Sequence, residues 1–252
     1  MRYLFATLLL IANTAIKAQS GNIEPQKLCK ERIGSLMVER YRIDVGKRYI
    51  GEASSDTILC YNPTEKPIEI GIGEAPEGLM ARFDTPTIQP KSTANLVVTI
   101  YQTDQSKVGY YFETFSLIEN GEYILYPYFS YTAKLENNYT KFTTEELANA
   151  PKIECNSPTF DFGTINEGAK IKAQFEIKNS GKTDLEIFNI STSCGCTEAK
   201  SNLMIIAPGM STKIAVTFDS SNRHGNQYKT ITIYSNSPTS PEFQLSISGI
   251  VK

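Results

Sequence analysis

The sequence predicts an all-β protein with two tandem immunoglobulin-like β-sandwich domains after a cleaved signal peptide. Valine, isoleucine, threonine and aromatic residues dominate the apolar runs, with 14 tyrosines, 12 phenylalanines and no tryptophan. These residue types suit pleated, half-buried strands. A set of aspartate, glycine and asparagine positions also recurs after a domain-length interval, and the chain opens with a short apolar stretch typical of export.

The N-terminus has the pattern of a secretory signal peptide. Met1-Arg2-Tyr3 precedes an almost wholly apolar run over 4–12, and Ala18 precedes the polar residues 19–22. We expect residues 1–18 to be removed and residues 19–33 to form an N-terminal segment. The apolar run is shorter than the roughly 20 residues that a membrane-spanning helix needs. The expected product is an exported protein without a transmembrane segment, in the periplasm or at the cell surface.

An internal repeat predicts the two domains. Four positions recur 117 residues later in the chain, which chance rarely produces in constant register. They are Asp44 and Asp161, Gly46 and Gly163, Gly51 and Gly168, and Asn62 and Asn179. With one added residue, segment 88–92 matches 206–210. We therefore predict one sandwich over 34–135, a linker over 136–155 and a second sandwich over 156–252.

Strand patterns support a sandwich in the second copy. Apolar residues at 171, 173, 175 and 177 alternate with polar ones, so one face of that strand is buried. Seven strands in about 100 residues is immunoglobulin-like spacing. The expected strands span roughly 159–165, 170–179, 184–191, 202–206, 211–219, 228–235 and 242–251. In the linker, Thr143 and Glu146 form a capping-box pattern that predicts one helical turn.

The second copy resembles the bacterial domain-of-unknown-function 1573 (DUF1573) family. The residues that carry the resemblance lie at 160–165, 167–168, 175, 178–181, 193–197, 207–209, 218–219 and 235–238. The resemblance implies an immunoglobulin-like fold and an exported location, and it implies no activity. The first copy departs from the family, because Glu74-Ala75-Pro76-Glu77-Gly78 stands where the second copy has Ser193-Cys194-Gly195-Cys196-Thr197.

Composition and motifs argue against catalysis and against nucleic-acid binding. A formal net charge of −2 and the absence of a basic cluster offer no attraction to phosphate backbones. The sequence has one histidine, His224, and no nucleophile elbow, phosphate loop, dinucleotide fingerprint or H-E-x-x-H motif. We therefore expect no enzyme and no catalytic residues, and we expect a protein partner.

The strongest local signal is the pair Cys194 and Cys196. The loops after alternate strands of a sandwich share one end, so both thiols and His224 are candidate ligands for Zn²⁺ or Cu⁺. Two other interpretations stay open. The thiols fill space beneath a tight structural loop, or they enter an intermolecular or long-range disulfide. A disulfide between residues two apart would close a small, strained ring and be reducible.

The other cysteines and one aromatic segment complete the candidates. Cys60 matches the inward position of Ile177 and is expected in the core, while Cys29 and Cys155 either bridge or stay free. In segment 123–131 both faces of one strand are apolar or aromatic, which predicts either a doubly covered strand or a ligand or partner surface. The favoured function is a structural or protein-interaction module of the cell envelope. The alternative is a metal-binding or thiol-redox protein.

Overall fold

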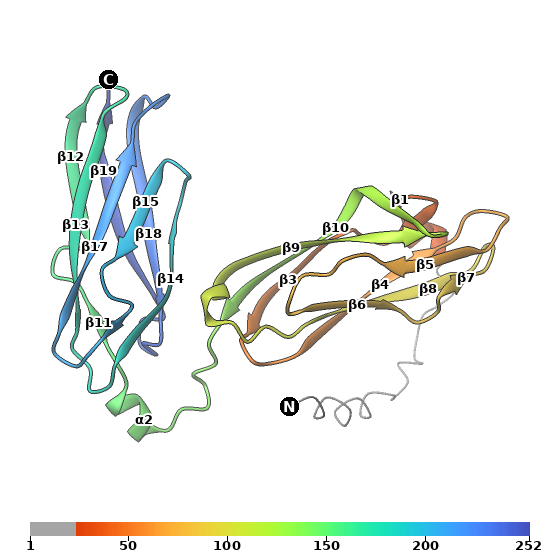
Figure 1. The fold of residues 1–252 in the computed structure, drawn as a ribbon, viewed down its shortest axis with the longest axis horizontal. Helices are drawn as coiled ribbons and strands as arrows, with labels where there is room; N and C mark the ends of the chain where they lie inside the picture. The colour runs from red at the N-terminus through yellow and green to blue at the C-terminus, as the bar shows by residue number, and fades with distance from the viewer. Residues whose placement is uncertain (1–23) are drawn as a thin grey trace.

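The computed structural model describes residues 24–252, and it shows an all-β protein with two β-sandwiches, as predicted (Figure 1). The expected signal peptide, 1–18, and residues 19–23 lie outside the described part. The helical elements are α1 (Pro25–Leu28), a 3₁₀ turn η1 (Gln105–Lys107) and α2 (Thr144–Asn149). Among residues 24–252, no helix combines the length and the apolar character needed to cross a bilayer.

The first sandwich packs two five-stranded sheets around one core. The first sheet contains, in spatial order, β1 (Glu31–Ile33), β2 (Leu36–Val38), β4 (Ser54–Tyr61), β8 (Thr93–Ile100) and β6 (Leu79–Phe83). The second sheet contains β3 (Arg42–Tyr49), β10 (Glu122–Glu136), β9 (Gly109–Glu119), β5 (Ile68–Ile72) and β7 (Thr87–Ile88). Strands alternate buried with less buried residues, as in β8, so each sheet buries one face.

The second sandwich repeats this plan. One sheet contains β11 (Ile153–Glu154), β13 (Lys170–Asn179), β17 (Ser211–Asp219) and β15 (Thr197–Ser201). The other contains β12 (Thr159–Ile165), β19 (Glu242–Val251), β18 (Gly225–Ser235), β14 (Leu185–Thr192) and β16 (Ile205–Ile206). The prediction of a single strand at 202–206 is wrong, because the chain leaves β15 in one sheet and joins the other sheet as β16.

The recurring aspartate and glycine make the same bulge in both sandwiches. Gly46 N donates to Asp44 Oδ1 at 3.1 Å, and Gly163 N donates to Asp161 Oδ1 at 2.8 Å. Both glycines have positive φ, 63° and 67°, which a residue with a Cβ adopts only at a cost. The bulges shift the parallel pairing of β3 with β10 and of β12 with β19.

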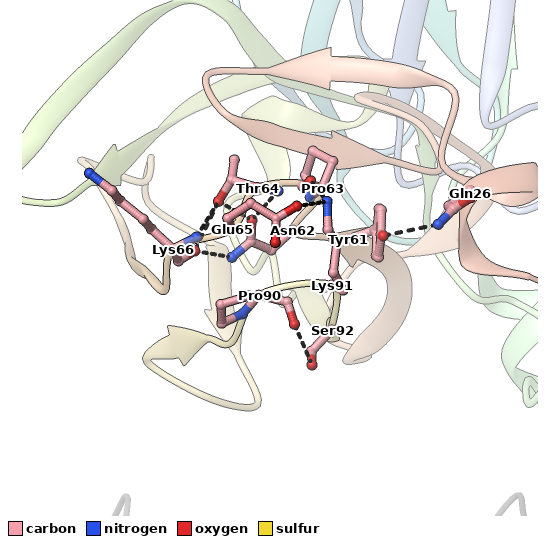
Figure 2. A network of polar contacts seen from close by, with 10 residues as sticks. All are labelled: Gln26, Tyr61, Asn62, Pro63, Thr64, Glu65, Lys66, Pro90, Lys91 and Ser92. Atoms are coloured by element: carbon pink, nitrogen blue, oxygen red, sulfur yellow. Dashed lines mark hydrogen bonds and ion pairs between the residues drawn. The ribbon is translucent and has the colours of Figure 1, made fainter.

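A buried asparagine clamps the two sheets of the first sandwich together, and Figure 2 shows its hydrogen bonds within the turn over 62–66. Asn62 follows β4 and is fully buried. Its Nδ2 donates to Lys66 O at 2.7 Å and to Ile88 O, in β7 of the opposite sheet, at 2.9 Å. Its Oδ1 accepts from Thr64 N and Thr64 Oγ1. One side chain therefore shapes the turn after β4 and ties it to β7.

Asn179 does the same in the second sandwich, at the position that the repeat predicted. It is also fully buried. Its Nδ2 donates to Thr183 O and Ile206 O, both at 2.8 Å, and its Oδ1 accepts from Gly181 N at 2.9 Å. Each of these three partners is the repeat equivalent of a partner of Asn62, including Ile206 in β16 for Ile88 in β7. The repeat in sequence is thus a repeat of one hydrogen-bond network.

The linker includes the predicted capped helix and lies against the second sandwich. Thr143 caps α2, because its Oγ1 accepts from Glu146 N and its own N–H donates to Glu146 Oε2. Tyr139 Oη donates to Ser235 O at 3.2 Å. The two sandwiches also touch directly, since Lys134 Nζ lies 2.8 Å from Glu242 Oε1.

Replacing either clamp asparagine by alanine should destabilise its sandwich by about 2–4 kcal/mol, because two buried carbonyls lose their donor. Urea unfolding of Asn62→Ala and Asn179→Ala measures the loss. Asn202→Ala, at an exposed position, is the control and should leave the midpoint unchanged. Wild-type midpoints in both clamp variants would contradict the clamp.

Lys91→Gly should stabilise the first sandwich and raise its Tm by about 2–4 °C. Lys91 has a φ of 55°, whereas its counterpart in the second sandwich is Gly209, with a φ of 78°. Differential scanning calorimetry measures the change. Lys91→Ala, which removes the exposed ion pair to Glu65 and keeps a Cβ, separates the two effects. A Tm that falls in Lys91→Gly as far as in Lys91→Ala would show that side-chain contacts outweigh the backbone conformation.

Candidate functional site

The Cys-Gly-Cys loop connects β14 to β15 and is closed by a disulfide. Cys194 and Cys196 are bonded to each other, and both are half-buried. Thr197 Oγ1 lies 3.5 Å from Cys194 Sγ and 4.0 Å from Cys196 Sγ. Thr192 Oγ1 donates to Cys194 O and Thr197 O, which holds the loop. A hydroxyl group therefore touches both sulfurs of a partly accessible disulfide.

His224 lies at the same end of the sandwich, in the loop before β18. Its Nε2 is 3.7 Å from Glu167 Oε2, and Asn222 N donates to Glu167 Oε1 at 3.0 Å. The Cys loop reaches this end through Asp219 N, which donates to Cys196 O at 2.9 Å. Within 24–252, no three His, Cys, Asp or Glu side chains converge as a metal site would require. The site of Cys194, Cys196 and His224 for Zn²⁺ or Cu⁺ stays a prediction, and it would need the disulfide reduced.

The remaining cysteines have different surroundings. Cys60 is fully buried in the first core, as expected, and Cys29 is buried beside it. Burial raises the pKa of the Cys60 thiol to about 12, and burial with the nearby Glu39 carboxylate raises that of Cys29 to about 11. Thiols that stay protonated are poor nucleophiles. Both thiols are free, as is that of the half-buried Cys155.

The aromatic segment of β10 forms an exposed surface with β9. Residues 125–128 of β10 lie opposite only Ser116 of β9, because the register shifts between Ile124 and Phe129. The extra residues leave the ladder, so Leu125 and Tyr126 are each 80% exposed. The large exposed residues here are Tyr110, Phe112, Tyr123, Leu125, Tyr126 and Tyr128. The second interpretation of segment 123–131, a ligand or partner surface, fits this arrangement.

The structure also shows an apolar surface that the sequence analysis missed. We name it the apolar corner, and it consists of Leu203, Met204, Ile205 and Met210, which are 45–60% exposed. It lies where the chain crosses from β15 to β16. Leu203 N donates to Thr212 Oγ1, so this crossing lies beside the start of β17, next to Met210.

The repeat itself carried a signal for the apolar corner. The equivalent residues of the first sandwich are Thr85, Pro86, Thr87 and Ser92. The backbone bonds of the two crossings correspond, since Ile187 N donates to Met204 O and Ile70 N donates to Pro86 O. The two copies thus share the backbone here, but only the second copy exposes large apolar side chains. Comparing the copies residue by residue would have revealed this difference.

Comparisons with solved structures show the fold. The chain is similar to a protein of unknown function from Porphyromonas gingivalis W83, with 18% identity, a TM-score of 0.57, and coverage of 86% of this chain and 100% of that chain. Two weaker similarities have TM-scores below 0.5. A PapD-like domain of human CEP192 (TM-score 0.35, 13% identity) covers 46% of this chain and 94% of its own. The CupB2 chaperone of Pseudomonas aeruginosa (TM-score 0.29, 7% identity) covers 84% and 98%.

The second sandwich matches one known sequence family. No curated protein matches the chain. The sequence model of the family described as "Protein of unknown function (DUF1573)" matches residues 153–251. This range begins at β11 and ends with β19, so it spans all the strands of the second sandwich. It also includes the Cys-Gly-Cys loop and the apolar corner. The resemblance deduced from the sequence is confirmed, and the second sandwich of this chain is a DUF1573 domain.

Proposed function

We propose that this chain is a non-enzymatic protein-interaction module, exported to the bacterial cell envelope, that binds a partner protein through the apolar corner of its DUF1573 domain. The observation that carries the proposal is the exposure of four large apolar side chains on one crossing loop and the adjacent turn. Large apolar side chains exposed together on neighbouring segments mark interaction sites. The signal-peptide pattern of residues 1–18 supports export.

The chemistry of the apolar corner favours a protein partner. Two of its members, Met204 and Met210, have flexible thioether side chains that adapt to an uneven apolar surface. Ile205 points outward while the next residue, Ile206, is buried, so its exposure follows from strand alternation. The neighbouring strand β15 is an edge strand that, within 24–252, pairs only with β17. Such an edge offers backbone groups to an extended segment of the partner.

The disulfide favours a second candidate function, thiol–disulfide exchange at the Cys-Gly-Cys loop. A thiolate of a partner dithiol would attack one sulfur, forming a mixed disulfide and releasing the other as a thiolate. The second partner thiol would then break the mixed disulfide. The partner leaves oxidised, and Cys194 and Cys196 are left as two thiols. Thr197 Oγ1, close to both sulfurs, supports this candidate because its hydroxyl can donate to the thiolate that leaves.

The apolar corner should crosslink to one envelope protein in cells. A photocrosslinking residue at Met204, a position that the triple variant below leaves in place, is expected to give one adduct, whereas the same residue at exposed Glu176 of β13 should give none. The triple variant Leu203→Thr, Ile205→Thr, Met210→Ser copies the first sandwich. It should weaken binding of the purified partner by at least about tenfold. A tenfold change in Kd corresponds to about 1.4 kcal/mol, which is a small part of the free energy that burying these three apolar side chains contributes. No adduct, or an adduct that the triple variant retains, would refute the proposal.

The Cys194–Cys196 disulfide should open in the folded protein at mild ratios of reduced to oxidised dithiothreitol. Maleimide labelling and intact mass should then show two more labels than the oxidised protein, with Cys155 counted as background. Cys194→Ser with Cys196→Ser removes those labels. Thr197→Val should slow the opening and leave its equilibrium close to wild type. If the disulfide resists reduction until the domain unfolds, it is structural, and the exchange candidate fails.

A further inference from the structure

A groove on the outer face of the first sandwich combines aromatic walls with a polar floor. It encloses about 390 Å³, within the range of about 300–1,000 Å³ typical of small-molecule sites. It crosses β3, β10 and β9, and it shares no residue with the apolar corner. The proposed function does not depend on it.

Strand register defines the floor of the groove. Thr132 of β10 pairs with Asp44 of β3 on one side and with Phe112 of β9 on the other. In the next row, Ser130 pairs with Arg42. Paired residues point to the same face of a sheet, and neighbouring strands lie about 4.8 Å apart. The carboxylate of Asp44 and the ring of Phe112 therefore stand roughly 10 Å apart on the same face of the sheet, with the hydroxyl of Thr132 between them.

The bulge of β10 supplies the aromatic end of the groove. Tyr126 and Tyr128 lie at the groove, with their rings edge to face at 6.2 Å between centroids. Their side chains are 80% and 43% exposed, and that of Phe112 is 50% exposed. Aromatic rings this exposed offer their faces to a ligand.

The polar groups of the groove have free hydrogen-bonding capacity. Asp44 uses Oδ1 for the backbone N–H of Gly46, which leaves Oδ2 available. The Arg42 guanidinium carbon lies 5.5 Å from the centre of the Tyr41 ring, and its N–H groups bond to no acceptor in the described part of the chain. Across residues 24–252, the hydroxyls of Ser130 and Thr132 also make no side-chain hydrogen bond. A carboxylate acceptor, a guanidinium donor and two hydroxyls thus converge on one space.

We propose that this groove binds a neutral hexose oligosaccharide. A pyranose ring has an apolar face of C–H bonds, which suits the electron-rich face of Tyr126 or Phe112. Its rim of hydroxyls both donates and accepts, which matches Asp44, Arg42 and the hydroxyl floor. An apolar peptide would leave these polar groups unsatisfied. An anionic sugar would face the Asp44 carboxylate, so the neutral class is preferred.

Calorimetric titration of residues 19–252 with defined sugars tests the proposal. The probes are neutral hexasaccharides of glucose, mannose and galactose, with hexagalacturonic acid as the anionic probe. We expect at least one neutral probe to bind with a Kd below about 1 mM. Tyr126→Ala and Phe112→Ala should each raise that Kd by about tenfold, equivalent to one lost stacking contact. Asp44→Asn keeps the shape and the bond to Gly46 N, and it should raise Kd similarly.

The matched control is Tyr228→Ala, which removes an exposed tyrosine of the second sandwich and should leave Kd unchanged. Four outcomes would overturn the proposal. The first three are no binding of any neutral probe, tighter binding of hexagalacturonic acid that weakens with salt, and a neutral-sugar Kd unaffected by all three groove variants. Loss of sugar binding in the corner variant Leu203→Thr, Ile205→Thr, Met210→Ser would also overturn it, because the groove would then not be the site.

Discussion

The frame of each sandwich depends on one fully buried asparagine that bonds to both sheets. In the second sandwich, Asn179 ends β13 and donates to Ile206 O in β16, which belongs to the opposite sheet. Core packing brings the sheets together but is not directional. A buried amide tolerates few positions, because each unsatisfied group costs about 1–3 kcal/mol. The clamp therefore fixes the turn after β13 and the place where the chain crosses between sheets.

The two sandwiches share this frame and differ on their surfaces. Asn62 and Asn179 bond to equivalent partners, and the bulges at Gly46 and Gly163 are equivalent. The exposed side chains diverge, because a solvent-facing position is not constrained by the core. The first sandwich has the aromatic groove, and the second has the apolar corner and the Cys-Gly-Cys loop. Two copies of one fold thus present distinct surfaces on a common backbone.

The apolar corner and the disulfide loop lie at opposite ends of β17. Leu203 is bonded to Thr212 near the start of the strand, and Cys196 O accepts from Asp219 N at its end. The nine residues of this strand extend over about 30 Å at roughly 3.3 Å each. Changes at one end can therefore be made without touching the other. Partner binding and thiol chemistry are separable questions for this domain.

The sequence by itself determined the fold class, the repeat and the DUF1573 resemblance, because alternation and turn residues act over short distances. It also predicted that Cys60 lies in the core and that Thr143 caps the helix α2. The prediction of one strand at 202–206 was wrong at the crossing over 202–204, since an apolar run does not indicate which of the two sheets each residue joins. The sequence left the state of Cys194 and Cys196 open, and the tertiary structure shows them bonded to each other. The groove needed Asp44 and Phe112 on either side of β10, a proximity that only long-range strand pairing creates.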